Sequence, residues 1–111
     1  MKKYILFIGL SLSFNSIADS SCTGKLSVLS IGRGGTVLIK GPGGLPYVYL
    51  CNTEIKSNEV EPSACRAMYS TLLSAHAQDK EVDITFNPSI SSCADLKNWG
   101  TAANLNWIMV K

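Results

Sequence analysis

Residues 62–87 read PSACRAMYSTLLSAHAQDKEVDITFN and contain the clearest helix-to-strand transition of the chain. Residues 63–78 are predicted to form a helix, because apolar side chains recur there at the three-to-four spacing of one buried face. That apolar set is Cys65, Met68, Tyr69, Leu72 and Leu73. Pro62 stands at the start, where a helix accepts proline in its first turn. Residues 81–87 alternate between apolar and polar, which predicts a half-buried strand.

Three short apolar segments precede the helix, and glycine-rich turns separate them. The predicted strands are residues 25–31, 36–40 and 46–51, and the turns are residues 32–35 and 41–44. Glycine adopts positive φ without steric cost, so these segments are typical of hairpin turns. No Gly-Lys-Ser/Thr ending follows them, which argues against a phosphate-binding loop.

After residues 81–87 the pattern weakens and then recovers. Residues 88–104 are predicted to be a long irregular connection, and residues 105–110 (LNWIMV) a last strand buried on both faces. The resulting order is β-β-β-α-β-β, a mainly β domain with one helix. This is the order of the OB-fold, a small five-stranded Greek-key barrel. An open α+β sheet with the helix on one face uses the same elements and remains an alternative.

The N-terminal segment has the features of a secretory signal peptide. Lys2 and Lys3 precede an apolar run over residues 4–12, and the small residues Ser16 and Ala18 have the spacing of a cleavage site. The apolar run is shorter than the roughly 20 residues that span a bilayer. An N-terminal anchor or a buried helix is the alternative. We therefore predict a signal peptide over residues 1–18 and a single domain over residues 19–111, either secreted or periplasmic.

The charge balance of this 111-residue chain excludes two classes of partner. Ten basic residues face eight acidic ones, but Lys2 and Lys3 lie in the predicted signal peptide, and their removal leaves a net charge of zero. Proteins that bind nucleic acid need a basic surface to replace counterions. A polybasic membrane surface is excluded for the same reason. The expectation is no nucleic acid partner and no membrane insertion.

The four cysteines are predicted to form two structural disulfides. Their number is even, and a small exported domain usually oxidises such cysteines. No Cys-x-x-Cys spacing occurs and the chain has one histidine, so neither a metal nor another cofactor is expected. Four cysteines allow three connectivities. In an OB topology the first strand is antiparallel to the fourth, which favours pairing Cys22 with Cys93 and Cys51 with Cys65.

Few residues are candidates for catalysis. His76 is available as a general base, but its place in the last helical turn favours a residue packed against the barrel. Asp79, Glu81 and Asp83 lack the spacing of a calcium-binding loop and favour a solvated acidic edge. Nucleophile and metalloprotease motifs are also absent from the sequence. The chain is therefore not expected to be an enzyme.

Aromatic residues are the candidates for binding. Trp99 falls in a loop with glycine and asparagine, and Tyr47 and Tyr49 share one side of a strand because they are two residues apart. If that side faces outward, the tyrosines form a binding surface; if it faces inward, they are part of the core. Trp107, within the last apolar strand, is expected in the core.

Residues 46–84 resemble the binding subunits of the subtilase-cytotoxin and typhoid-toxin type, pertussis-like toxins with five B subunits. The shared pieces are Pro46-Tyr47, Cys51, Ala64-Cys65, residues 69–72 and Val82-Asp83-Ile84. The chain also resembles small exported proteobacterial proteins of unknown role. The shared pieces there are residues 22–25, 50–52 and 69–73 and Asn98-Trp99.

These resemblances imply an OB-like secreted domain that binds a glycan or glycoprotein, with a homo-pentamer as the toxin-like assembly. The alternative function is a periplasmic protein-interaction domain, either an inhibitor or an accessory of a secretion system.

Overall fold

The computed structural model describes residues 19–111, which form a mainly β domain with one α-helix. The predicted signal peptide, residues 1–18, lies outside the described residues. The strands are β1 (Asp19–Lys25), β2 (Val28–Ile31), β3 (Thr36–Lys40), β4 (Val48–Asn52), β5 (Glu81–Ile90), β6 (Gly100–Thr101) and β7 (Leu105–Val110). The helix is α1 (Pro62–Ala77), and the 3₁₀ turns are η1 (Pro42–Gly44) and η2 (Cys93–Asp95).

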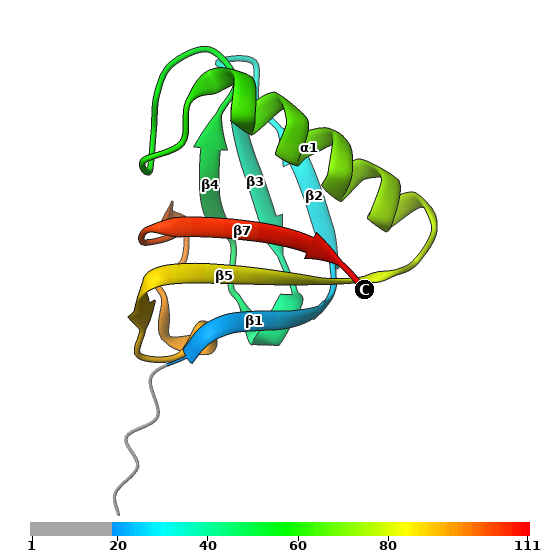
Figure 1. The fold of residues 1–111 in the computed structure, drawn as a ribbon, viewed down its shortest axis with the longest axis vertical. Coiled ribbons are helices and arrows are strands. Elements are labelled where there is room, and N and C mark those ends of the chain that lie inside the picture. Colours follow the sequence, from blue (N-terminus) through cyan, green and yellow to red (C-terminus); the bar gives the residue numbers. More distant parts are fainter. Residues whose placement is uncertain (1–18) are drawn as a thin grey trace, which may run out of the picture.

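The strands form two sheets that cross each other. One sheet has the order β1-β5-β7 and is antiparallel; the other has the order β2-β3-β4-β6, in which β6 is parallel to β4. Figure 1 shows β1, β5 and β7 running across the direction of β2, β3 and β4, with α1 at one end of both sheets. The largest fully buried side chains come from both sheets and from α1, and they include Ile39, Leu50, Leu72, Ile84 and Val48.

The described residues contain seven strands rather than the predicted five. The strand predicted over residues 25–31 is divided, because Lys25 ends β1 and Val28 begins β2. Between them the chain turns from one sheet into the other: Leu26 is buried, and the Ser27 N–H donates to the Lys40 carbonyl at 2.8 Å. The other additional strand is the two-residue β6, within the connection predicted to be irregular.

The last strand was predicted to be buried on both faces, and this prediction is wrong. Ile108 lies opposite the buried Ile84 on the core side of the sheet, and the side chains on either side of it point away from the core, so one face of β7 is open to solvent. Trp107 is 63% exposed and Met109 42% exposed on that face, whereas Leu105 is buried. The core position expected for Trp107 is therefore wrong. Successive side chains of a strand point to opposite faces, so only every second apolar residue of β7 can reach the core.

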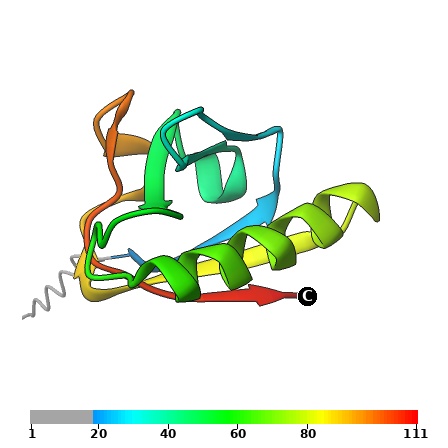
Figure 2. The same ribbon diagram turned by 90° about the horizontal axis from the view of Figure 1, so that it is seen from above.

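The helix begins and ends one residue before the predicted bounds of 63–78, and the burial of its last turns differs from the prediction. Cys65, Leu72 and Ala75 are buried, whereas Leu73 and His76 are exposed. Figure 2 shows the C-terminal end of α1 extending past the strands; in its last turn Ala75 is the residue that faces the core, and His76, next to it, is exposed. The expected packing of His76 against the barrel is wrong for this reason.

Both disulfides of the structure have the connectivity that the OB topology favoured. Cys22 is bonded to Cys93 and Cys51 to Cys65, with Cα–Cα distances of 5.9 and 5.8 Å. The first bond ties β1 to η2, and the second ties the end of β4 to the first turn of α1. The predicted antiparallel pairing of residues 25–31 with the strand after the helix is not found: Val28–Ile31 pairs with β3, and the strand that pairs with β5 is Asp19–Lys25, with Cys22 opposite Ile84.

Candidate functional site: an aromatic cluster on the outer face of β4

Tyr47 and Tyr49 lie on the outer face of the second sheet. Val48 and Leu50, which alternate with them, are fully buried on the core side. Tyr47 and Tyr49 are half-buried, so the face that the sequence left open is the outward one.

Trp99 joins the two tyrosines from the segment that leads into β6. Its ring stacks on Tyr47, with centroids 4.7 Å apart and planes 11° from parallel. It meets Tyr49 edge to face at 6.4 Å. From the other side, β3 places the Lys40 ammonium 5.0 Å from the centroid of the Tyr47 ring. We call Lys40, Tyr47, Tyr49 and Trp99 the Trp99 cluster; the three aromatic residues predicted as binding candidates are thus in one place.

Backbone contacts hold Trp99 in an uncommon conformation. Its φ is +63°, a left-handed value that bulky residues rarely adopt. The Trp99 N–H donates to the Tyr47 carbonyl at 2.6 Å, and the Tyr47 N–H donates to Oδ1 of Asn98 at 3.1 Å. Both bonds join the backbone of Tyr47 to the Asn98–Trp99 segment, which holds the Trp99 backbone next to the tyrosine on which the indole stacks.

The arrangement leaves one aromatic face available for a ligand. Tyr47 lies between Trp99, on the β6 side of β4, and Lys40, on the β3 side, so both of its faces are covered. Trp99 is covered by Tyr47 on one face only and remains 52% exposed. The exposed aromatic surface of the Trp99 cluster is therefore the outer face of Trp99 rather than a platform made by the two tyrosines.

Two members of the site were missed at the sequence level. Lys40 belongs to the alternating segment TVLIK, and its position two residues after the outward-facing Leu38 places it on the outer face beside β4. That alternation was sufficient to predict its face. Asn98 carried no such signal, because its role is to accept a hydrogen bond from a backbone group distant in sequence.

The remaining candidate residues lie elsewhere. Asp79 forms an exposed ion pair with Lys25 at 2.9 Å, and Asp83 accepts a hydrogen bond from the Thr23 hydroxyl at 2.9 Å. Glu81 and His76 are exposed. Residues 19–111 contain no group of three or more His, Cys, Asp or Glu side chains placed to hold a metal ion.

A second ordered surface feature is the loop between β4 and α1. The buried Asn52 side chain donates to the Gly34 carbonyl and accepts from the Ile55 N–H at 3.1 Å. Arg66 donates to the Thr53 carbonyl at 2.6 Å. These contacts, with the Cys51–Cys65 disulfide, fix a loop on which Ile55 is 65% exposed.

Comparison with protein-family models, curated proteins and solved structures gives no significant match to this chain. Within the part of the chain that the structure describes, no helix combines the length and the apolar character needed to cross a bilayer.

Proposed function

We propose that this chain is an exported, non-enzymatic binding module that recognises a glycan or the glycan of a glycoprotein at the Trp99 cluster. The observation that carries the proposal is the half-exposed Trp99 ring, stacked on Tyr47 and held by backbone hydrogen bonds. A fixed aromatic face suits the apolar C–H side of a sugar ring, because both surfaces are already ordered and little conformational entropy is lost on binding.

Polar groups around Trp99 supply the second half of sugar recognition. Oδ1 of Asn98 accepts from the Tyr47 N–H, which leaves its amide nitrogen as a donor. Thr101 is exposed and lies opposite Tyr49 in the β4–β6 pairing. The Lys40 ammonium lies across Tyr47 from the open face of Trp99, so it supports the stack rather than the ligand. Donors and acceptors at the rim of an aromatic surface match the hydroxyl groups at the edge of a sugar ring.

Replacing Trp99 by alanine is expected to weaken glycan binding at least about 30-fold, which is about 2 kcal/mol. The reason is that the substitution removes the one open aromatic face of the site. Screening the protein on a glycan array, followed by calorimetric titration of the best ligand, measures the change. The control is Trp107→Phe, which alters the other exposed tryptophan and should bind as the unaltered protein does. Equal affinity of the Trp99→Ala protein would refute the proposed site.

The same proposal treats the domain as an OB-like barrel with two sharp corners. β1 continues into β2 at Leu26, and β6 continues into β7 through the buried Ala102. Each of these pairs can be taken as one bent strand. The hydrogen-bonded pairings then form a closed circuit, which runs from β1–β2 to β3, β4, β6–β7 and β5 and back to β1. Strands that bend from one sheet to the other are the usual corners of orthogonally packed sheets.

Export is part of the proposal and has a direct test. The signal-peptide pattern predicts cleavage after Ala18, so the exported chain should begin at Asp19. Intact-mass measurement of protein from the periplasm or the medium gives the N-terminus. A chain that is exported with Met1 retained would contradict the signal peptide.

The alternative function, a periplasmic protein-interaction domain such as an inhibitor or secretion accessory, is favoured by the exposed Ile55 on its fixed loop. Apolar side chains on ordered loops contribute strongly to protein interfaces. If Ile55→Glu abolishes capture of a protein partner while Trp99→Ala does not, this second function replaces the first. The toxin resemblance also implies a ring of five copies, which native mass spectrometry distinguishes from the two-fold pairing described below.

A further inference from the structure

Within residues 19–111, no strand lies beside one edge of β7. The strand lies at the end of its sheet and pairs with β5 on one side only. In Figure 2, which is seen from above, α1 passes over the first part of β7, whereas the arrow end of β7 lies at the margin of the molecule and is not covered by α1. Its unpaired backbone groups are therefore available to a further strand.

This edge lacks the features that usually prevent strand addition. Lysines, prolines and very short edge strands are the common protections. β7 contains neither charge nor proline over Leu105–Val110. At the edges of the other sheet, β2 has four residues and β6 has two. β7 is also apolar on its solvent side, where Trp107 and Met109 are 63% and 42% exposed.

The hydrogen bonding of β7 fixes which residues face the open edge. The Lys111 N–H donates to the Glu81 carbonyl at 2.9 Å, so the backbone groups of Lys111 point toward β5. In an antiparallel pair this direction alternates along the strand. The N–H and C=O groups of Met109 therefore also point toward β5, whereas those of Ile108 and Val110 point to the open edge.

We propose that two copies of this chain pair antiparallel along β7, about a two-fold axis at Ile108. Ile108 and the partner's Ile108 then exchange two backbone hydrogen bonds and join two three-stranded sheets into one of six strands. Trp107 lies opposite the partner's Met109 in the neighbouring pair without hydrogen bonds, where cross-strand side chains are closest. The thioether of methionine makes favourable contacts with aromatic rings.

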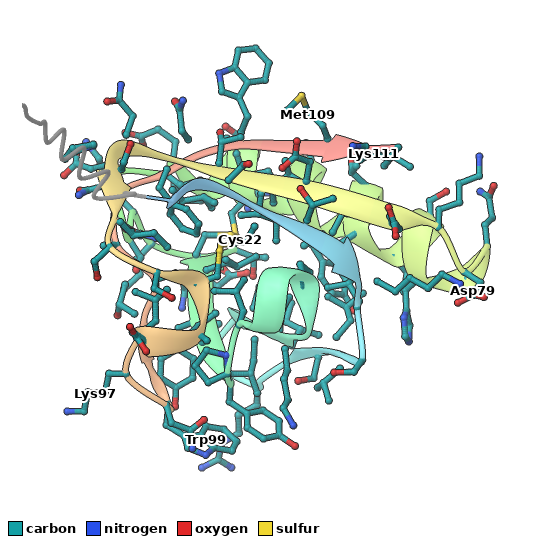
Figure 3. All side chains as sticks on the ribbon, turned by 90° about the horizontal axis from the view of Figure 1, so that it is seen from below. Cys22, Asp79, Lys97, Trp99, Met109 and Lys111 are labelled. Atoms are coloured by element: carbon teal, nitrogen blue, oxygen red, sulfur yellow. A yellow bond between two sulfur atoms is a disulfide. The ribbon has the colours of Figure 1, made fainter. Side chains whose placement is uncertain are left out.

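A second copy fits this edge because the edge is complementary to itself. A two-fold interface brings each contact twice, residue i with j and j with i. Trp107 and Met109 flank Ile108 symmetrically, so both Trp–Met pairs form together. No charged side chain opposes another, because β7 itself carries no charge and this register places Lys111 opposite the apolar Leu105 of the partner subunit. The pairing is independent of the Trp99 cluster: Figure 3 shows Trp99 on the side of the molecule opposite Met109.

The oligomeric state of the full chain, expressed and purified from cells, tests the pairing. Sedimentation equilibrium should give a mass that rises to two chains as concentration increases. Trp107→Lys places a charge at the interface and should keep the protein folded and monomeric at every concentration. Trp99→Lys is the matched control, with a 52% exposed tryptophan on the other side, and should remain dimeric. A monomeric unaltered protein, or a ring of five, would overturn the proposal.

Engineered cysteines test the register. Trp107→Cys and Met109→Cys chains, mixed and oxidised, should form a crosslinked dimer, because the two positions face each other within disulfide reach. Either variant alone should not crosslink, since like positions then lie diagonally, about 7–8 Å apart or more. A dimer that crosslinks in neither arrangement would show that the copies meet elsewhere and would refute the β7 interface.

Discussion

Replacing Cys22 and Cys93 together by alanine is expected to lower the free energy of unfolding by about 4 kcal/mol. The disulfide closes a loop with a sequence separation of 71 residues, and in the chain-entropy model the stabilisation grows with loop length. Both cysteines are buried, so the substitution also removes packed atoms. Small domains have total stabilities of only about 5–15 kcal/mol, and this change approaches the lower limit. Urea unfolding measured by circular dichroism gives the difference.

The Cys51→Ala and Cys65→Ala pair is the matched control. Its sequence separation is 14, which predicts a smaller loss of about 3 kcal/mol. The two double variants should therefore differ by about 1 kcal/mol, with the Cys22–Cys93 variant less stable. The reverse order would show that the long disulfide does not restrict the unfolded chain as the model requires.

Substitution of Gly41 by alanine is expected to destabilise the fold by about 4 kcal/mol. Gly41 has φ +129°, and a Cβ added there would lie 2.5 Å from the Lys25 carbonyl oxygen and 2.7 Å from the Ser27 nitrogen. These atoms form the corner between β1 and β2, so the chain cannot move away without opening that corner. Thermal unfolding measures the loss.

Gly34→Ala provides the control for this corner. No atom lies within 4 Å of a Cβ at Gly34, so its substitution should change the stability little. If Gly41→Ala and Gly34→Ala were equally stable, the close approach of β3 to the β1–β2 corner would be contradicted.

Periodicity predicted the elements whose environment is uniform along their length. The alternation in β5 and the apolar spacing of α1 gave these elements within a few residues, because each packs one face on the core. The division between β1 and β2 was not visible, since Leu26 continues an apolar pattern while the backbone changes sheets. Such a corner depends on contacts with Lys40 and Gly41, which are distant in sequence.

The sequence predicted the three aromatic residues of the candidate site, but it predicted neither Lys40 and Asn98 nor the arrangement of the cluster. Spacing showed that Tyr47 and Tyr49 share a face, but the direction of that face is set by the burial of Val48 and Leu50. Trp99 and Trp107 show more clearly that the sequence does not predict which side chains are exposed. Trp107 lies in an apolar segment yet is exposed, because it projects from the face of β7 that points away from the core, and a continuous run of apolar residues does not show which face is covered.

The central claim is that a ligand stacks on the open face of Trp99, and tryptophan fluorescence tests it most directly. In a Trp107→Phe protein, Trp99 is the one tryptophan of the chain, so its emission reports on the site alone. Titration with the best ligand from the glycan array should shift and saturate that emission, with the same dissociation constant that calorimetry gives. Binding by calorimetry without any change in Trp99 emission would place the ligand elsewhere and contradict the claim.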